Sequence, residues 1–242
     1  MEIKNLYTCG CSFMSVDCGD DPPVISFLEI YARQKNLQHV SLGRSGATNF
    51  LIRLQIEEAI KQHADYIVIG TTSNDRIDLV TGQTHLPITI QDVDYRGYGS
   101  NSQFNIVNES PTIISDSITN WTENLYELGI HGNRTRPVSE HTIEAIKHYV
   151  SRLHDSNLSI MKDYYMIADG LRKLISLGKE FILIPSISMR DCDWSFVGNR
   201  LWNGKLPWEM PYGFKDNTIT HNPQSAHDLF AEILSKITGH WG

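Results

Sequence analysis

The strongest constraint on the fold is an alternation of strands and helices in the first 75 residues. Short apolar strands are predicted at Ile3–Cys9, Gln38–Leu42 and Tyr66–Gly70, and the last is apolar enough to be buried on both faces. Helices are predicted from about Val24 to Gln34 and after Thr48, which is a good N-cap. This order predicts a three-layer α/β/α sandwich with a central, mostly parallel sheet.

Each of the three predicted strands is followed by a polar or glycine-containing turn. Ser12 follows the first strand, Gly46 the second and Asn74 the third. In parallel sheets, ligands bind beyond the carboxyl ends of the strands. We therefore expect these three turns to meet at one edge of the sheet.

The remainder of the chain predicts two insertions within a single domain of residues 1–242. Residues 76–137 are irregular and polar, with room for a small hairpin, and residues 186–215 are rich in loops. Both are expected to cover the active face. Their aromatic residues, at Tyr95–Tyr98 and Trp194–Trp208, suit either stacking on sugar rings or ordinary packing.

The second half of the chain returns to regular structure. Two helices are predicted between Val138 and Gly178, and a fourth strand at Glu180–Pro185. A final helix begins directly after His221, because Asn222 is a good N-cap and Pro223 suits the first helical position.

Composition excludes several classes of partner and cofactor. The 242 residues carry 21 basic and 28 acidic side chains, a net charge of −7, which argues against a nucleic-acid binder. No apolar run approaches the ~20 residues of a membrane span and no targeting signal is visible, so we expect a cytoplasmic chain without a membrane partner. The pair Cys9 and Cys11 is too closely spaced for the usual zinc pair, so neither a metal nor a cofactor is expected.

Four short motifs resemble the blocks of the SGNH (GDSL-like) hydrolase superfamily. They are Gly10-Cys11-Ser12-Phe13, Ser45-Gly46-Ala47-Thr48, Ser73-Asn74-Asp75, and His221 followed by Ala226 and His227. The Gly-Cys-Ser-Phe version is similar to members from bacteria and tailed phages. The resemblance covers roughly residues 1–80 and 215–240 and leaves the middle of the chain unmatched.

The resemblance implies a role for each matched position. Ser12 would be the nucleophile and His221 its general base, since a serine hydroxyl needs an adjacent base at neutral pH. The backbone N–H groups of Ser12 and Gly46 and the amide of Asn74 would form the oxyanion hole, with Gly43 as an alternative to Gly46.

The third member of the catalytic triad departs from the family pattern. The family has an Asp three residues before the histidine, and this chain has Thr218 there. Asp216, five residues before His221, is our choice for the orienting acid. A distant acid, or a backbone carbonyl that orients the histidine, would serve instead.

The predicted function is hydrolysis of an acyl ester, with acetyl on a carbohydrate as the first choice. The main alternative is a catalytically degenerate protein of the same fold that binds ligands or forms part of a virion. The absence of the family's Asp, in whose place this chain has Thr218, favours this alternative. An acyltransferase that uses the same site is a further alternative. A nucleotide-binding domain is disfavoured because no Gly-x-Gly-x-x-Gly follows a strand. Oligomeric state and natural substrate stay open.

Overall fold

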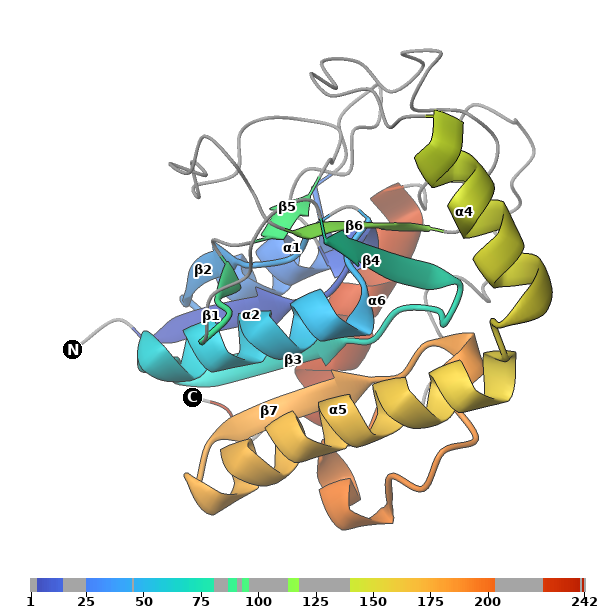
Figure 1. Ribbon diagram of the computed structural model, residues 1–242. Helices are drawn as coiled ribbons and strands as arrows, with labels where there is room; N and C mark the ends of the chain where they lie inside the picture. The colour runs from blue at the N-terminus through green and yellow to red at the C-terminus, as the bar shows by residue number, and fades with distance from the viewer. Residues whose placement is uncertain are drawn as a thin grey trace.

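The protein is built on a four-stranded, fully parallel sheet with strand order β2-β1-β3-β7 (Figure 1). The computed structural model describes residues 4–14, 25–44, 46–80, 87–90, 93–95, 113–117, 140–202, 224–239 and 241. The four strands are β1 (Asn5–Cys9), β2 (Gln38–Ser41), β3 (Tyr66–Gly70) and β7 (Glu180–Ile184). All four were predicted from the sequence to within two residues at either end.

Helices cover both faces of this sheet. Figure 1 shows α2 (Asn49–Lys61) and α5 (Ser156–Ser176) in front of it, and α1 (Phe27–Gln34) and α6 (Gln224–Ile237) behind it. Since side chains alternate along a strand, each face has its own apolar core. The first core contains Ile67, Leu183, Ile56 and Leu171, and the second contains Val68, Ile182, Phe27 and Phe230. The predicted three-layer α/β/α sandwich is therefore confirmed.

Side-chain caps set the beginnings of three helices. The Thr48 hydroxyl accepts the N–H of Leu51 at 3.1 Å, as predicted. Ser26 caps α1 in the same way, so this helix begins at Phe27 and not near Val24. Asp155 caps α5 and separates it from α4 (Glu140–Arg152), which confirms two helices in this region.

The described parts of the first predicted insertion form a second sheet in place of the expected small hairpin. Its strands are β4 (Arg76–Val80), β5 (Val93–Tyr95) and β6 (Ile113–Ser117), in the order β4-β6-β5. β4 pairs with β6 in antiparallel orientation, whereas β5 pairs with β6 in parallel. β4 and β5 follow one another in the sequence but do not pair, and the next pair, β5 and β6, is parallel, so none of these three described strands forms a hairpin with the strand next to it in the sequence. β4 begins two residues after Asn74, so the second sheet starts at the carboxyl edge of the first.

In the described half of the second predicted insertion, the tryptophans pack into the core, which corrects the expectation that they could stack on sugar rings. This half contains the 3₁₀ turns η3 (Ile187–Met189) and η4 (Ser195–Arg200). The Trp202 N–H donates to the Leu183 carbonyl at 2.8 Å, so the chain continues alongside β7. Trp194 and Trp202 are each only 3% exposed, and neither is available to stack on a sugar. Trp208 lies outside the described residues.

None of the helices in the described ranges is both long and apolar enough to cross a membrane.

Candidate functional site

The turn after β1 places Ser12 at the carboxyl edge of the central sheet. Ser12 is the first residue of η1 (Ser12–Met14), and the Met14 N–H donates to the Cys11 carbonyl at 2.9 Å. Gly10 is required here because a Cβ atom would lie 2.3 Å from Met14 Cγ and 2.9 Å from the Gly70 carbonyl oxygen. The close approach of these two strand ends fixes the path of the chain into Ser12.

A buried amide from α2 holds this turn. Gln55, which is fully buried, accepts the Gly10 N–H at 2.6 Å and donates to the Gly10 carbonyl at 3.3 Å. The Arg44 N–H, from the loop after β2, donates to the same carbonyl at 3.0 Å. The turn that carries Ser12 is thus fixed both by a helix on one face of the sheet and by the neighbouring strand's loop.

The turn after β3 is held equally firmly. The buried Asn49 amide accepts the Thr72 N–H at 2.9 Å and donates to the Thr72 carbonyl at 3.0 Å. On the other side, the Ser186 hydroxyl donates to the same carbonyl and the Ser186 N–H donates to Thr71 Oγ1. The turn after β3 is therefore fixed from two sides, by Asn49 of α2 and by Ser186, which lies just beyond β7.

A small cavity of about 180 Å³ lies beside these two turns. Ser12 sits in the chain between two of its lining residues, Cys11 and Phe13. The full lining is Cys11, Phe13, Thr71, Thr72, Ser73, Arg76, Ser186 and Ile187. The cavity thus combines apolar groups with hydroxyls next to the predicted nucleophile.

The sheet topology brings three predicted site positions to one edge. Ser12, Gly46 and Asn74 follow β1, β2 and β3, which are neighbours in the sheet. Gly46 has a φ of 80°, a backbone conformation that favours glycine. The Ser12 side chain, His221 and Asp216 lie outside what the structure describes, so their contacts stay predictions.

Asn74 faces away from the small cavity in this structure. Its Nδ2 donates to the Ser156 carbonyl at 3.3 Å, and the residue lines a second, larger cavity. Because an amide nitrogen carries two hydrogens, one of them is not used by this bond. Its predicted role as an oxyanion donor therefore requires the side chain to turn towards Ser12.

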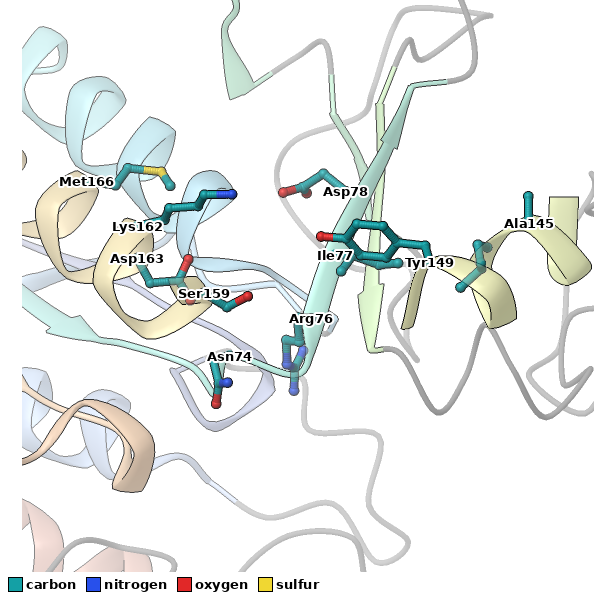
Figure 2. A pocket seen from close by; sticks show the side chains of 11 residues that line it. Asn74, Arg76, Ile77, Asp78, Ala145, Tyr149, Ser159, Lys162, Asp163 and Met166 are labelled. Carbon is teal, nitrogen blue, oxygen red and sulfur yellow. The ribbon is translucent and has the colours of Figure 1, made fainter. Parts of the chain in front are cut away.

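The larger cavity has a volume of about 520 Å³ and lies between β4, α4 and α5 (Figure 2). Arg76 lines both cavities, so the two are close neighbours. The remaining lining residues are Asn74, Ile77, Asp78, Ala145, Ile146, Tyr149, Ser159, Lys162, Asp163 and Met166.

Asp163 lines the larger cavity, and the fold raises the pKa of its carboxyl group. Burial raises the pKa of its carboxyl to about 6, although the Asn49 hydrogen bond and the nearby Lys162 charge act in the opposite direction. Asn49 Nδ2 donates to Asp163 Oδ2 at 2.8 Å and also holds Thr72. Asn49 therefore links this carboxyl to the turn that borders the small cavity.

We expect Asp163→Asn to stabilise the protein at pH 8 but not at pH 4. The folded protein holds the Asp163 proton more tightly than the unfolded chain does, so ionisation between pH 4 and 8 reduces stability. The variant keeps an oxygen that accepts from Asn49 and has no charge to bury. The gain at pH 8 should be about 1–2 kcal/mol in urea unfolding.

Asp169→Asn is the matched control, since Asp169 lies on the same helix and its side chain is 74% exposed. It pairs with Arg53 at 2.8 Å, so its loss should cost no more than about 1 kcal/mol at pH 8. The prediction would be contradicted if the Asp163→Asn variant were less stable than the wild-type protein at pH 8.

Residues of α1, β2 and β1 form an array of a carboxylate, an imidazole and a hydroxyl. Glu29 Oε2 lies 3.0 Å from His39 Nδ1, and His39 Nε2 lies 3.1 Å from Thr8 Oγ1. Thr8 is fully buried, neither of the two cavities reaches it, and burial lowers the pKa of His39. The array resembles a triad in geometry, but its hydroxyl has no access to a substrate, so we regard it as structural.

Sequence reasoning missed four residues of this region: Asn49, Gln55, Arg76 and Asp163. Gln55 carried a signal, because it is a polar residue within the apolar stripe of its helix. Asn49, Arg76 and Asp163 carried none, because their positions depend on long-range packing. Among the residues that the structure describes, no group of three His, Cys, Asp or Glu side chains is arranged to hold a metal ion.

No family model matches the chain, and no curated protein matches it. One similar solved structure is a salicylyl-acyltransferase, SsfX3, from a tetracycline biosynthetic pathway. It aligns with a TM-score of 0.42 and 13% sequence identity over 99% of this chain. The chain spans only 56% of the length of that protein. A similarity at this level assigns neither family nor activity.

Proposed function

We propose that this chain is a serine esterase of the SGNH type that removes a short acyl group from a carbohydrate. The observation that carries the proposal is the placement of Ser12 on a firmly held turn at the carboxyl edge of the sheet, beside a small cavity. Nucleophilic serines of α/β hydrolases occupy strand-to-helix turns of this kind.

In the proposed reaction, Ser12 Oγ attacks the ester carbonyl carbon while His221 takes the hydroxyl proton. The carbonyl oxygen becomes negatively charged in the tetrahedral intermediate and is stabilised by the N–H groups of Ser12 and Gly46 and the Asn74 amide. Collapse of the intermediate breaks the bond to the sugar oxygen, which receives the proton from His221. Water then attacks the carbonyl carbon of the acyl-serine while His221 takes a proton from it, and collapse of the second tetrahedral intermediate breaks the bond to Ser12 Oγ, which receives the proton as the acid leaves.

Asp216 is our proposal for the acid that orients His221. It replaces in function the family's Asp, whose position is occupied by Thr218. A carboxylate that orients the imidazole raises the reaction rate without taking the proton itself.

The two cavities suit the two halves of such an ester. The small cavity, made partly apolar by Phe13 and Ile187, has room for a short acyl group. The larger cavity has a volume within the range of about 300–1,000 Å³ that is typical of small-molecule sites. Arg76 lines both, so the two cavities are neighbours, and we propose that one substrate occupies both.

A fluorophosphonate probe should label the native protein at Ser12. The probe traps an activated serine, so labelling should disappear on heat denaturation. Peptide mass spectrometry identifies the modified residue among all the serines. An unlabelled native protein would favour the alternative of a degenerate binding or virion protein. Acyl transfer to an added alcohol in preference to water would instead favour an acyltransferase.

A further inference from the structure

Arg76 is a cation whose side chain has no protein partner within the part of the chain that the structure describes. It makes no hydrogen bond or ion pair there, and its Nε is buried. A buried polar nitrogen without an acceptor costs free energy, because it has lost its bonds to water. A ligand with a negatively charged oxygen would supply the missing acceptor.

The position of Arg76 makes it accessible to a substrate. It lines both cavities, and Figure 2 shows its side chain beside Asn74, at the start of β4. A group bound in the larger cavity therefore lies within reach of the guanidinium, and so does a group bound in the small cavity beside the Ser12 turn.

The other charged groups of the larger cavity do not neutralise Arg76 by direct pairing. Lys162 adds a second positive charge on α5. The carboxylates are Asp78 and Asp163, and each has its own donor: Thr48 Oγ1 lies 2.9 Å from Asp78 Oδ1, and Asn49 holds Asp163. Neither carboxylate pairs with Arg76 within the described residues, so the guanidinium stays available to a ligand.

The rest of the lining suits a sugar. Tyr149, on α4, presents an aromatic ring that is 40% exposed, and the apolar face of a sugar ring packs well on such a surface. Ser159 and Asn74 add polar groups that can bond to hydroxyls.

We propose that Arg76 binds an anionic group of the substrate, so that the ester is carried by an acidic sugar. The identification of the ligand as an ester rests on the proposed function, whereas the anion site does not. A guanidinium forms paired hydrogen bonds with carboxylate and phosphate oxygens alike. The anionic group is therefore the carboxylate of a uronic sugar or the phosphate of a sugar phosphate.

Binding of non-reacting sugars tests the anion site separately from catalysis. Calorimetry with the Ser12→Ala protein would compare methyl glucuronide, methyl glucoside, glucose 6-phosphate and methyl glucosaminide. We expect an anionic sugar to bind at least about tenfold more tightly than the neutral glucoside, a difference of about 1.4 kcal/mol. Arg76→Gln should remove that difference, and the tighter of the two anions identifies the natural group. Equal binding of all four sugars, or a preference for the cationic glucosaminide, would overturn the proposal.

Ester kinetics then separate the two proposals. With acetylated methyl glucuronide and acetylated methyl glucoside, Arg76→Gln should lower kcat/KM for the acidic ester by about 10–100-fold and change the neutral ester by less than about threefold. Arg76→Lys should fall between, and Lys236→Gln, which removes an exposed cation on α6 that lines neither cavity, should have little effect. If the wild-type protein turns over both esters equally well, the anion site is wrong and the esterase stands. If neither ester reacts but anionic sugars bind through Arg76, the esterase is wrong and the anion site stands. The comparison of the two esters on the wild-type protein holds even if an Arg76 variant fails to fold.

Discussion

Replacing Ser12 with alanine should reduce ester turnover by about 10³-fold or more while the protein stays folded. The substitution removes the oxygen that forms the acyl intermediate, and no neighbouring group restores it. Alanine keeps the same backbone, so the Met14 N–H bond to the Cys11 carbonyl and the Gln55 contacts with Gly10 are retained. The measurement is hydrolysis of p-nitrophenyl acetate, with circular dichroism as a check on folding.

Ser176→Ala is the matched control for this variant. Ser176 is exposed and is the last residue of α5, shortly before β7 begins, so it lies at the opposite edge of the sheet from Ser12. Its replacement should leave turnover unchanged. If Ser12→Ala retains more than about a tenth of the wild-type activity, Ser12 is not the nucleophile, because loss of such a group costs far more.

The central sheet could be predicted because its signals are local. Tyr66–Gly70 is a continuous apolar run of the length of a strand, and Thr48 is a capping residue directly before an apolar helical pattern. Neither feature depends on a distant part of the chain. The right-handed, short connections of parallel sheets then leave few ways to arrange such elements.

The second sheet and the segment after β7 could not be predicted in the same way. β4 and β6 pair across a long stretch of intervening chain, and nothing in either sequence specifies its partner. For Trp194 and Trp202, the sequence did not decide between sugar stacking and packing, because an aromatic-rich loop has the same pattern whether its side chains face solvent or the core. Their burial follows from the way the chain continues beside Leu183 after η4.

For the candidate site, the sequence predicted which positions share an edge but not how the turns are held. The placement of Ser12, Gly46 and Asn74 follows from the strand ends alone. The hydrogen bonds of Gln55 and Asn49 come from α2, and they depend on how this helix lies across the sheet. Their role is visible only once the packing is known.

Gln55→Leu should destabilise the protein by about 1–3 kcal/mol and reduce turnover by about 10–100-fold. Leucine has a similar size, so packing is largely kept, but the Gly10 N–H loses its acceptor in a buried position. The Gly10 carbonyl still accepts the Arg44 N–H, which limits the loss of stability. The turn that carries Ser12 would then be free to shift, and small displacements of a nucleophile greatly reduce its rate.

The control is Gln62→Leu, a change of the same type at the C-cap of the same helix. Gln62 bonds to the side chains of Tyr7 and Glu58 and to no backbone group of the Ser12 turn. Its loss should cost stability with little change in kcat. Chemical denaturation gives the first quantity, and kcat and KM measured well below the melting temperature give the second. Equal effects of the two variants on kcat would show that Gln55 stabilises the fold without positioning Ser12, because only a positioning role lowers kcat in molecules that are still folded.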